Sequence, residues 1–135
     1  MPITLAERAH AAILAAATEA APSEACGLLL GPETQIATHI ETAQPAANVH
    51  PDPTRHFEID PAALIAAHKA ARTGGPAVAG YFHSHPNGLA RPSATDAAMA
   101  SGDSRIWAIA ASGVVTLWRD TPSGFEALSY VRKES

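Results

Sequence analysis

The segment from His83 to Asp96 constrains the fold of this chain more than any other stretch of the sequence. On an extended strand alternate side chains share one face, so His83 and His85 would point the same way and Ser84 the opposite way. The residues that follow include several turn formers, which can reverse the chain: Pro86, Asn87, Gly88 and Pro92. The segment therefore predicts a strand, a tight loop and a return that carries Asp96 back toward the two histidines.

These polar side chains form a usable ligand set for one zinc ion. Zinc favours nitrogen and oxygen donors in a tetrahedral array, and a catalytic site keeps three protein ligands so that water takes the fourth position. Each piece also has a structural interpretation. A His-x-His pair is common on polar strand faces, and Ser93 followed by Asp96 is typical of a helix start. The two interpretations are compatible, because a helix that begins near Ser93 would hold Asp96 rigidly.

The same residues resemble a known motif. A glutamate, then His-Ser-His-Pro, six residues, a serine, two residues and an aspartate is similar to the JAMM motif of JAB1/MPN/Mov34 metalloproteases. The resemblance implies that His83, His85 and Asp96 bind one zinc ion (Zn²⁺) per chain. It also implies that Glu24, the upstream acid, holds and deprotonates the attacking water, while Ser93 helps to stabilise the tetrahedral intermediate. The resemblance extends over nearly all of the 135 residues.

The implied chemistry needs these residue types. Zinc lowers the pKa of a bound water from about 15.7 toward 7, so a hydroxide nucleophile forms near neutral pH. Glu24 would take the proton and later pass it to the leaving amine. Taken alone, Glu24 would read as an ordinary exposed acid at the end of a helix. Ser93 would offer its hydroxyl to the developing oxyanion, and a purely structural role as a helix cap is the open alternative.

The resemblance implies an α/β fold of the single-domain MPN type, cytidine-deaminase-like in outline, with a mixed β-sheet flanked by helices. A length of 135 residues is close to the commonest size of one domain, so we expect a single domain over residues 1–135. The sequence predicts three helices. The first follows a capping box from Thr4 to Glu7 and runs to Ala20. The second runs from Pro61 to Arg72, and the third covers residues 94–101. In the second helix we expect one face to contain Leu64, Ile65 and His68.

Strands are predicted between these helices. Residues 25–30 and 35–40 should form a hairpin with Glu24 at the edge of the sheet, and residues 76–85 should deliver the two histidines. Residues 43–56 read as an irregular loop, in which His50 and His56 are weaker candidates for substrate contact. Residues 106–111 and 114–118 should form a tight hairpin packed by Trp107 and Trp118, and residues 125–131 a last strand.

Composition narrows the function classes. A net charge of −4 and a pI near 5.9 disfavour nucleic-acid binding, which needs a basic face. No apolar run approaches the roughly 20 residues that span a membrane, and Glu7 and His10 interrupt any secretory pattern. The single cysteine, Cys26, excludes an intrachain disulfide and favours a cytoplasmic location. Cys26 could share a strand face with Glu24 near the metal, but a small buried hydrophobic role is the favoured interpretation.

The resemblance implies a zinc-dependent peptidase or isopeptidase. We expect it to hydrolyse the bond after the C-terminal tail of a ubiquitin-like protein or of a sulfur carrier that ends in Gly-Gly. The alternatives are a non-catalytic MPN scaffold or a RadC-like protein, and a peptidase that acts on cell-wall or phage-tail peptides. The complete set of motif residues disfavours a non-catalytic scaffold, and the acidic net charge disfavours a RadC-like protein. The sequence shows no export signal, which disfavours a peptidase of cell-wall or phage-tail peptides. The substrate protein, the type of bond, the physiological metal, the oligomeric state and any activating partner stay open.

Overall fold

The computed structural model describes residues 2–34 and 36–134, and its central element is a six-stranded sheet. The strand order is β4-β2-β5-β6-β7-β8. Only β5 and β6 run parallel, and the other neighbours are antiparallel. The sheet is therefore mixed, and its strands are β2 (Cys26–Leu30), β4 (Thr42–Ala46), β5 (Val78–Ser84), β6 (Ile106–Ala111), β7 (Val114–Thr121) and β8 (Gly124–Leu128).

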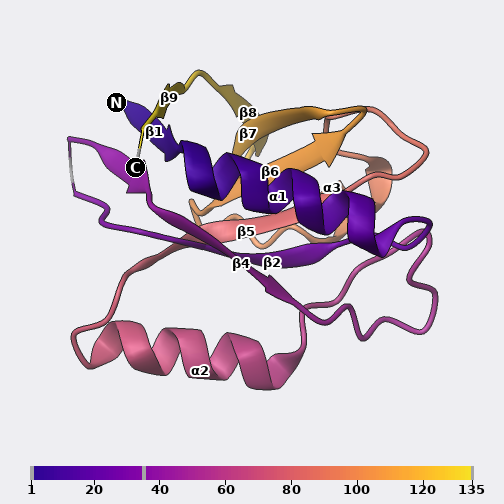
Figure 1. Cartoon of the computed structure of the whole chain (residues 1–135), viewed down its shortest axis with the longest axis horizontal. Helices are drawn as coiled ribbons and strands as arrows, with labels where there is room; N and C mark the ends of the chain where they lie inside the picture. The colour runs from indigo at the N-terminus through magenta and orange to yellow at the C-terminus, as the bar shows by residue number, and fades with distance from the viewer. Residues whose placement is uncertain (1, 35, 135) are drawn as a thin grey trace.

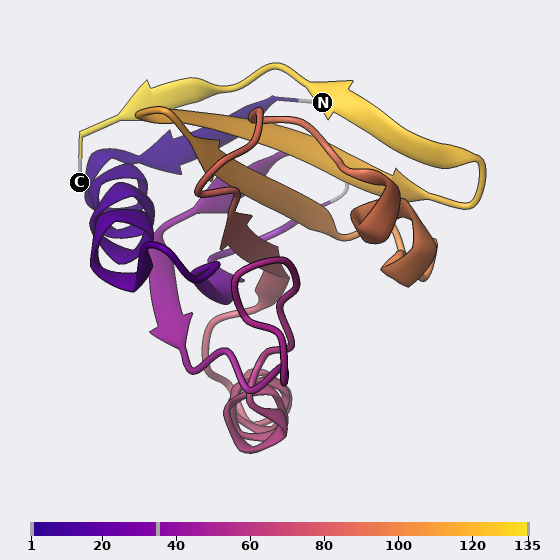
Figure 2. The ribbon, with the colours of Figure 1, turned by 90° about the vertical axis from the view of Figure 1, so that its right-hand side faces the viewer.

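A second, smaller sheet joins distant parts of the chain. Its order is β3-β1-β9, with β1 (Ile3–Ala6) parallel to both β3 (Thr38–Ile40) and β9 (Val131–Lys133). The C-terminal end of the chain runs from β8 along the rim of the molecule to reach β1 (Figure 2). The two ends of the chain are thus held in one sheet.

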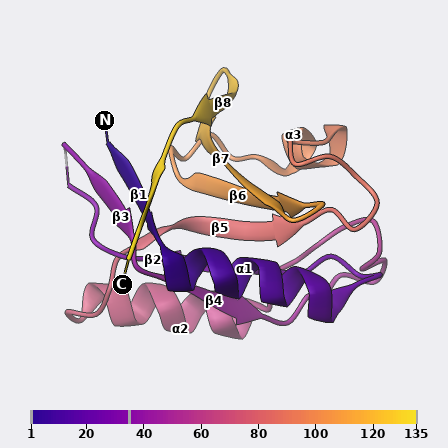
Figure 3. The same ribbon diagram turned by 45° about the horizontal axis from the view of Figure 1, so that its top comes forward.

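The helices cover the large sheet from both sides. Helix α1 (Glu7–Ala20) lies across one face, α2 (Pro61–Arg72) lies on the other side, and the short α3 (Ala94–Met99) follows β5 (Figure 1, Figure 3). Alternate residues of β6 serve the two sides: Ile106 and Ala108 join the core beneath α1, whereas Trp107 joins an aromatic cluster on the opposite face. Each apolar side chain buried fully in this way stabilises the fold by roughly 1.5–3 kcal/mol. No helix within the described residues is long and apolar enough to cross a membrane.

The predicted fold class is confirmed, and so are the main helices. Asp60 caps α2 by accepting a hydrogen bond from the backbone N–H of Ala62, at 3.1 Å. The predicted tryptophan hairpin is also confirmed, because Trp107 and Trp118 lie directly opposite each other on β6 and β7. Helix-start residues and turn residues in the local sequence were therefore sufficient to predict these elements.

The predicted capping box at Thr4 is wrong. Residues 3–6 form β1, and α1 begins at Glu7 without a side-chain cap. The Thr4 hydroxyl instead contacts Nδ1 of His39 on the neighbouring β3, at 2.6 Å. Ile3 and Leu5 are buried, so pairing with β3 and β9 outweighs the local preference for a helix cap.

The predicted hairpin between residues 25–30 and 35–40 is also wrong. The predicted second strand began at Gln35, which lies outside the described residues, and the observed β3 pairs with β1 rather than with β2. On its two sides β2 pairs with β5 and with β4, and all but the first residue of β4 lies in the segment predicted to be a loop. Pro45 argued against a strand, because proline has no backbone N–H to donate. However, β4 is an edge strand, where a missing N–H is tolerated.

Smaller corrections concern the ends of other elements. The predicted strand over residues 125–131 is split between β8 and β9 in two sheets, and α3 ends at Met99 rather than at residue 101. On α2, Ile65 is 67% exposed, whereas Leu64 packs toward the sheet. Leu64 makes this contact together with Ala67 and Ala71, at the three- and four-residue spacing of a helix face.

Candidate metal centre

The candidate site forms where β2 begins and β5 ends. Cys26 lies directly opposite His83 in the antiparallel pair, so Glu24 comes to the edge of the sheet beside the histidines. Ser84 points to the other face, where its hydroxyl accepts a hydrogen bond from the backbone N–H of Ala25, at 2.8 Å. His85 lies just beyond β5, and its backbone N–H donates to Ala110 at 2.9 Å. The strand register therefore sets the relative positions of Glu24 and the two histidines.

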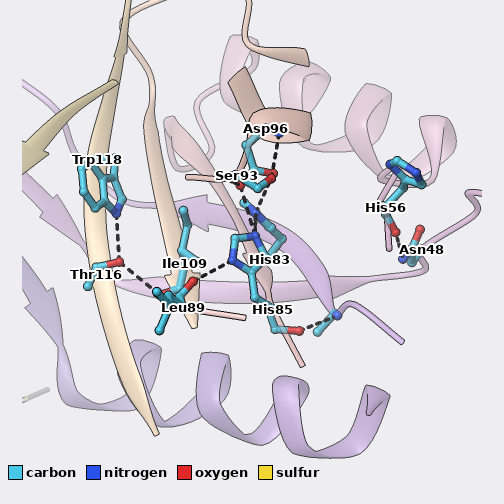
Figure 4. A network of polar contacts seen from close by, with 12 residues as sticks. Asn48, His56, His83, His85, Leu89, Ser93, Asp96, Ile109, Thr116 and Trp118 are labelled. Atoms are coloured by element: carbon cyan, nitrogen blue, oxygen red, sulfur yellow. Dashed lines mark hydrogen bonds and ion pairs between the residues drawn. The ribbon is translucent and has the colours of Figure 1, made fainter. Parts of the chain in front are cut away.

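The side chains of His83, His85 and Asp96 converge (Figure 4). The two Nε2 atoms lie 3.0 Å apart, His83 Nε2 lies 3.1 Å from Asp96 Oδ1, and His85 Nε2 lies 3.1 Å from Asp96 Oδ2. Zinc ligands lie about 2.0–2.1 Å from the ion, which places tetrahedral donors roughly 3.3 Å from each other. The spacing and chemistry of these donors fit one zinc ion.

The surroundings of the histidines fix their orientation. His85 Nδ1 lies 2.8 Å from the backbone carbonyl of Leu89, so this nitrogen carries the proton and Nε2 is left free to bind a metal. His83 is 1% exposed and stacks on Phe57, with ring centroids 4.3 Å apart, while the edge of Trp107 closes its other side. Both imidazoles are therefore held in place before any ion binds.

The electrostatics of two candidate ligands, His83 and Asp96, suit metal binding. For His85, burial would lower the pKa, but hydrogen bonds to Asp96 and to the Leu89 carbonyl outweigh it and raise that pKa. Burial lowers the pKa of His83, which keeps its imidazole neutral. Burial would raise the pKa of Asp96, but hydrogen bonds to His83 and His85 outweigh it and hold that pKa well below its usual range. A neutral imidazole and an ionised carboxylate are the forms that bind a cation.

Glu24 is buried beside these residues, being 7% exposed. Its carboxylate offers an oxygen within 4.8 Å of the ligand nitrogens of His83 and His85, so these three residues could also hold a metal. Burial raises the pKa of Glu24 to about 7, against the lowering effect of His85 and with a further rise from Asp96. An acid of this kind can exchange a proton near neutral pH.

Ser93 has the structural role that its position predicted. Its hydroxyl accepts the backbone N–H of Asp96 at 3.0 Å, and the Asp96 carboxylate accepts the backbone N–H of Ser93 at 2.9 Å, which completes a capping box. As acceptor in this contact, the hydroxyl keeps its own proton available. The role of Ser93 toward an oxyanion stays a prediction.

Cys26 is a small buried core residue, as favoured from the sequence. It is 1% exposed and packs with Phe57, Ile59 and Trp107. Its sulfur points to the backbone carbonyls of Ala46 and Ala47. Burial, with a further contribution from Glu24, raises the pKa of its thiol to about 12.

Two groups of supporting residues were not found from the sequence. Asn48 donates to the backbone carbonyl of His56 at 3.0 Å (Figure 4) and to that of Glu24, also at 3.0 Å. Its carbonyl oxygen accepts the backbone N–H of Glu58 at 3.0 Å. It thereby ties the loop after β4 to Glu24. Within that loop the rings of His50 and His56 stack on each other, 4.7 Å apart. In the sequence, an asparagine among prolines predicts only a turn. No sequence pattern therefore indicated that Asn48 supports Glu24.

The second group lies on β7. The Thr116 hydroxyl donates to the backbone carbonyl of Ala90 at 2.6 Å. It also accepts the indole N–H of Trp118 at 2.9 Å (Figure 4). Ala90 follows Leu89, whose carbonyl orients His85. This network anchors the loop between His85 and Ser93 to the sheet.

Among the hollows around the candidate centre, two differ clearly in chemistry. A polar cleft of about 350 Å³ is lined by Glu24, His85 and Ser93, together with Arg55 and Arg91. On the other side, Phe57 and Trp107 form part of a mostly apolar pocket of about 510 Å³ that extends to α2. The centre thus lies between two surfaces of different chemistry.

A sequence profile of the prokaryotic homologs of the JAB domain matches residues 6–121. The chain belongs to the prokaryotic JAB family. Membership confirms the resemblance seen in the sequence. The assignment as a hydrolase of the JAMM type rests on the named relatives.

Relatives and solved structures agree with this assignment to the JAB family. Desampylase of Haloferax volcanii is 33% identical over 132 residues, which cover 94% of each chain. A probable TtuB-protein conjugate cleaving protease of Thermus thermophilus is 40% identical over 76 residues, 56% of this chain and 48% of that protein. A solution structure from Desulfitobacterium hafniense has a TM-score of 0.88 at 33% identity, over 98% of this chain and 94% of that one. A JAB1/MPN domain protein from Archaeoglobus fulgidus shares the fold, with a TM-score of 0.61 at 20% identity and 98% of both chains covered.

Proposed function

We propose that this chain is a zinc-dependent peptidase or isopeptidase that acts in the cytoplasm. Its substrate is the bond that follows the C-terminal tail of a ubiquitin-like or sulfur-carrier protein. The convergence of His83, His85 and Asp96 to within 3.0–3.1 Å, with a buried glutamate beside them, carries the proposal. The names of the two relatives from Haloferax and Thermus support the substrate class.

In this proposal His83, His85 and Asp96 hold one zinc ion per chain. When bound, zinc acidifies a water molecule to a pKa of roughly 7 and polarises the scissile carbonyl. Glu24 accepts the proton of the attacking water on its carboxylate and then donates it to the leaving amine. Ser93 directs its hydroxyl proton to the carbonyl oxygen as negative charge develops there.

The alternatives lack such support. A non-catalytic scaffold would not need a buried carboxylate with a raised pKa beside a convergent ligand set. A RadC-like role in nucleic-acid processing would need a basic surface, and the chain carries a net charge of −4. Nothing in the geometry of the site favours cell-wall or phage-tail peptides over the tail of a carrier protein.

The test is a comparison of wild type with two variants that separate metal binding from chemistry. Glu24→Gln keeps the size of the side chain but cannot accept a proton, so it should retain about one zinc per chain and lose activity by at least about a hundredfold. Asp96→Ala should lose both zinc and activity. Elemental analysis and hydrolysis of a Gly-Gly-tailed carrier, either conjugated to a lysine or extended at its C-terminus, give the two readouts.

Near-normal turnover by Glu24→Gln would remove the general-base assignment. Zinc-loaded wild type that leaves every carrier conjugate and every extended carrier intact would overturn the substrate class.

A further inference from the structure

The polar cleft beside the candidate centre contains two arginines with no internal partner. Neither the Arg55 nor the Arg91 side chain makes an ion pair or hydrogen bond with another residue that the structure describes. Both are exposed and both line this cleft. They therefore present positive charge at the site of an otherwise acidic protein.

The other arginines have structural explanations. Arg72 lies in the last turn of α2, where a cation stabilises the helix end. Each of the remaining four faces a carboxylate: Arg8 with Glu41, Arg105 with Asp103, Arg119 with Glu33, and Arg132 with Glu7. Arg55 and Arg91 differ from all of these, because they are unpaired and lie in the same cleft.

The position of Glu24 indicates which part of a substrate would occupy this cleft. Glu24 lines the polar cleft together with His85, whereas Phe57 and Trp107 separate His83 from the apolar pocket. A group that protonates the leaving amine must lie on the side where that amine departs. The amine-bearing partner therefore belongs in the arginine-lined cleft, and the apolar pocket lies toward the acyl side.

We propose that Arg55 and Arg91 bind a carboxylate on the amine-bearing part of the substrate and thereby select which bonds are cut. The inference rests on the proposed function. Two sources supply this chemistry: acidic side chains next to an acceptor lysine, or the α-carboxylate of a residue that extends the carrier's C-terminus. A guanidinium suits either, because its planar N–H groups match a carboxylate in a bidentate manner.

The expected effect is moderate. The arginines are exposed, and exposed ion pairs are weak, so two of them should favour a carboxylate-bearing substrate by about three- to tenfold in kcat/KM. Salt screens such contacts, and the preference should shrink as ionic strength rises from about 0.05 to 0.5 M.

The experiment uses two matched substrate pairs with the zinc-loaded protein. In the first pair a Gly-Gly-tailed carrier is joined to a peptide lysine flanked by glutamates or by glutamines. In the second pair the carrier is extended by one residue that ends in a free carboxylate or in an amide. A preference confined to one pair identifies the source of the carboxylate.

The variants test whether these arginines cause the preference. In R55A/R91A the rates for the two members of the preferred pair should become equal, and in R55E/R91E the order should reverse. R72A is the matched control, since this exposed arginine lies outside the cleft, and it should keep the wild-type preference.

A binding measurement keeps the inference testable without turnover. The free lysine peptide with glutamate flanks, or the free amino acid against its amide, should perturb the NMR signals of Arg55 and Arg91 more than its neutral counterpart. Hydrolysis of all substrates at equal rates, with equal peptide binding, would overturn the inference and leave the proposed function standing. Carboxylate-dependent binding without any hydrolysis would instead overturn the proposed function.

Discussion

Two residues of the candidate centre, His85 and Ser93, are each held by one hydrogen bond that leaves a second polar group free to interact. His85 presents Nε2 because Nδ1 faces the Leu89 carbonyl, and Ser93 keeps a hydroxyl proton because its oxygen accepts from Asp96. Cys26 shows the opposite arrangement, since its thiol points away into the core. Proximity along a strand to Glu24 therefore does not make the thiol a ligand.

The Cys26 thiol should be unreactive in the folded protein. Because burial raises its pKa to about 12, only roughly one thiol in ten thousand is ionised at pH 8, and a thiolate-dependent reagent should label it only after denaturation. Cys26→Ala should keep one zinc per chain. Fast labelling of the native protein would show that the thiol is accessible and ionised, and loss of zinc in the variant would identify it as a ligand.

At the scale of elements, the loop from His85 to Ser93 depends on a strand that contributes nothing to the candidate centre itself. Thr116→Val keeps the side-chain volume but removes the hydrogen bond to the Ala90 carbonyl. We expect zinc affinity to fall by about tenfold, because the support of His85 is loosened. Competition titration with a zinc chelator measures it.

Trp118→Phe is the control for this variant, since it removes the indole N–H that donates to Thr116, together with part of the ring, but leaves the hydrogen bond from Thr116 to Ala90 in place. It should change zinc affinity less than Thr116→Val. Unchanged affinity in Thr116→Val would show that the loop holds its shape without β7.

The parallel pair at the centre of the sheet allows no side chain at Gly80. A Cβ atom there would lie 1.7 Å from the backbone oxygen of Ile106 on β6. Gly80→Ala should therefore lower the free energy of unfolding by about 3 kcal/mol or more, or prevent folding.

Ala66→Gly on the exposed face of α2 provides a comparison for Gly80→Ala, with an expected cost of roughly 1 kcal/mol in urea unfolding. Similar losses in the two variants would mean that β5 and β6 can separate without penalty.

Elements could be predicted from the sequence where local signals and long-range pairing agree. Asp60-Pro61 begins α2, and the turn formers after His85 return the chain to Asp96 in the observed manner. The predictions at Thr4 and Pro45 were wrong. Thr4 locally favours a helix cap and Pro45 locally favours a loop, but pairing with a distant strand overrides both preferences. The contacts of Asn48 could not be predicted from the sequence either. They depend on how the loop after β4 folds back onto Glu24, and no spacing of residues in the sequence indicates that path.

At the scale of the whole molecule, a bound metal would link three consecutive segments of the chain: β5, the loop after it and α3. Zinc at about a hundred times its dissociation constant adds roughly 2.7 kcal/mol to stability, which should raise Tm by about 5–10 °C. Wild type and Glu24→Gln should show this rise in a thermal melt, whereas Asp96→Ala should not.

Magnesium is the control for this measurement, because it prefers oxygen ligands and should have little effect on Tm. An equal rise with zinc in Asp96→Ala would place the ion elsewhere on the protein.

The strand register that joins Glu24 to the histidines exists only after two distant parts of the chain have paired. Ala25 and Ser84 are 59 positions apart in the chain, and the hydrogen bond between them forms only when β2 has found β5. A slip by one residue would turn the histidines to the opposite face of the sheet. If the chain acts as proposed, a copy in which β2 and β5 have not paired in this register lacks the arrangement of Glu24 and the histidines, so activity should appear only once the sheet has folded.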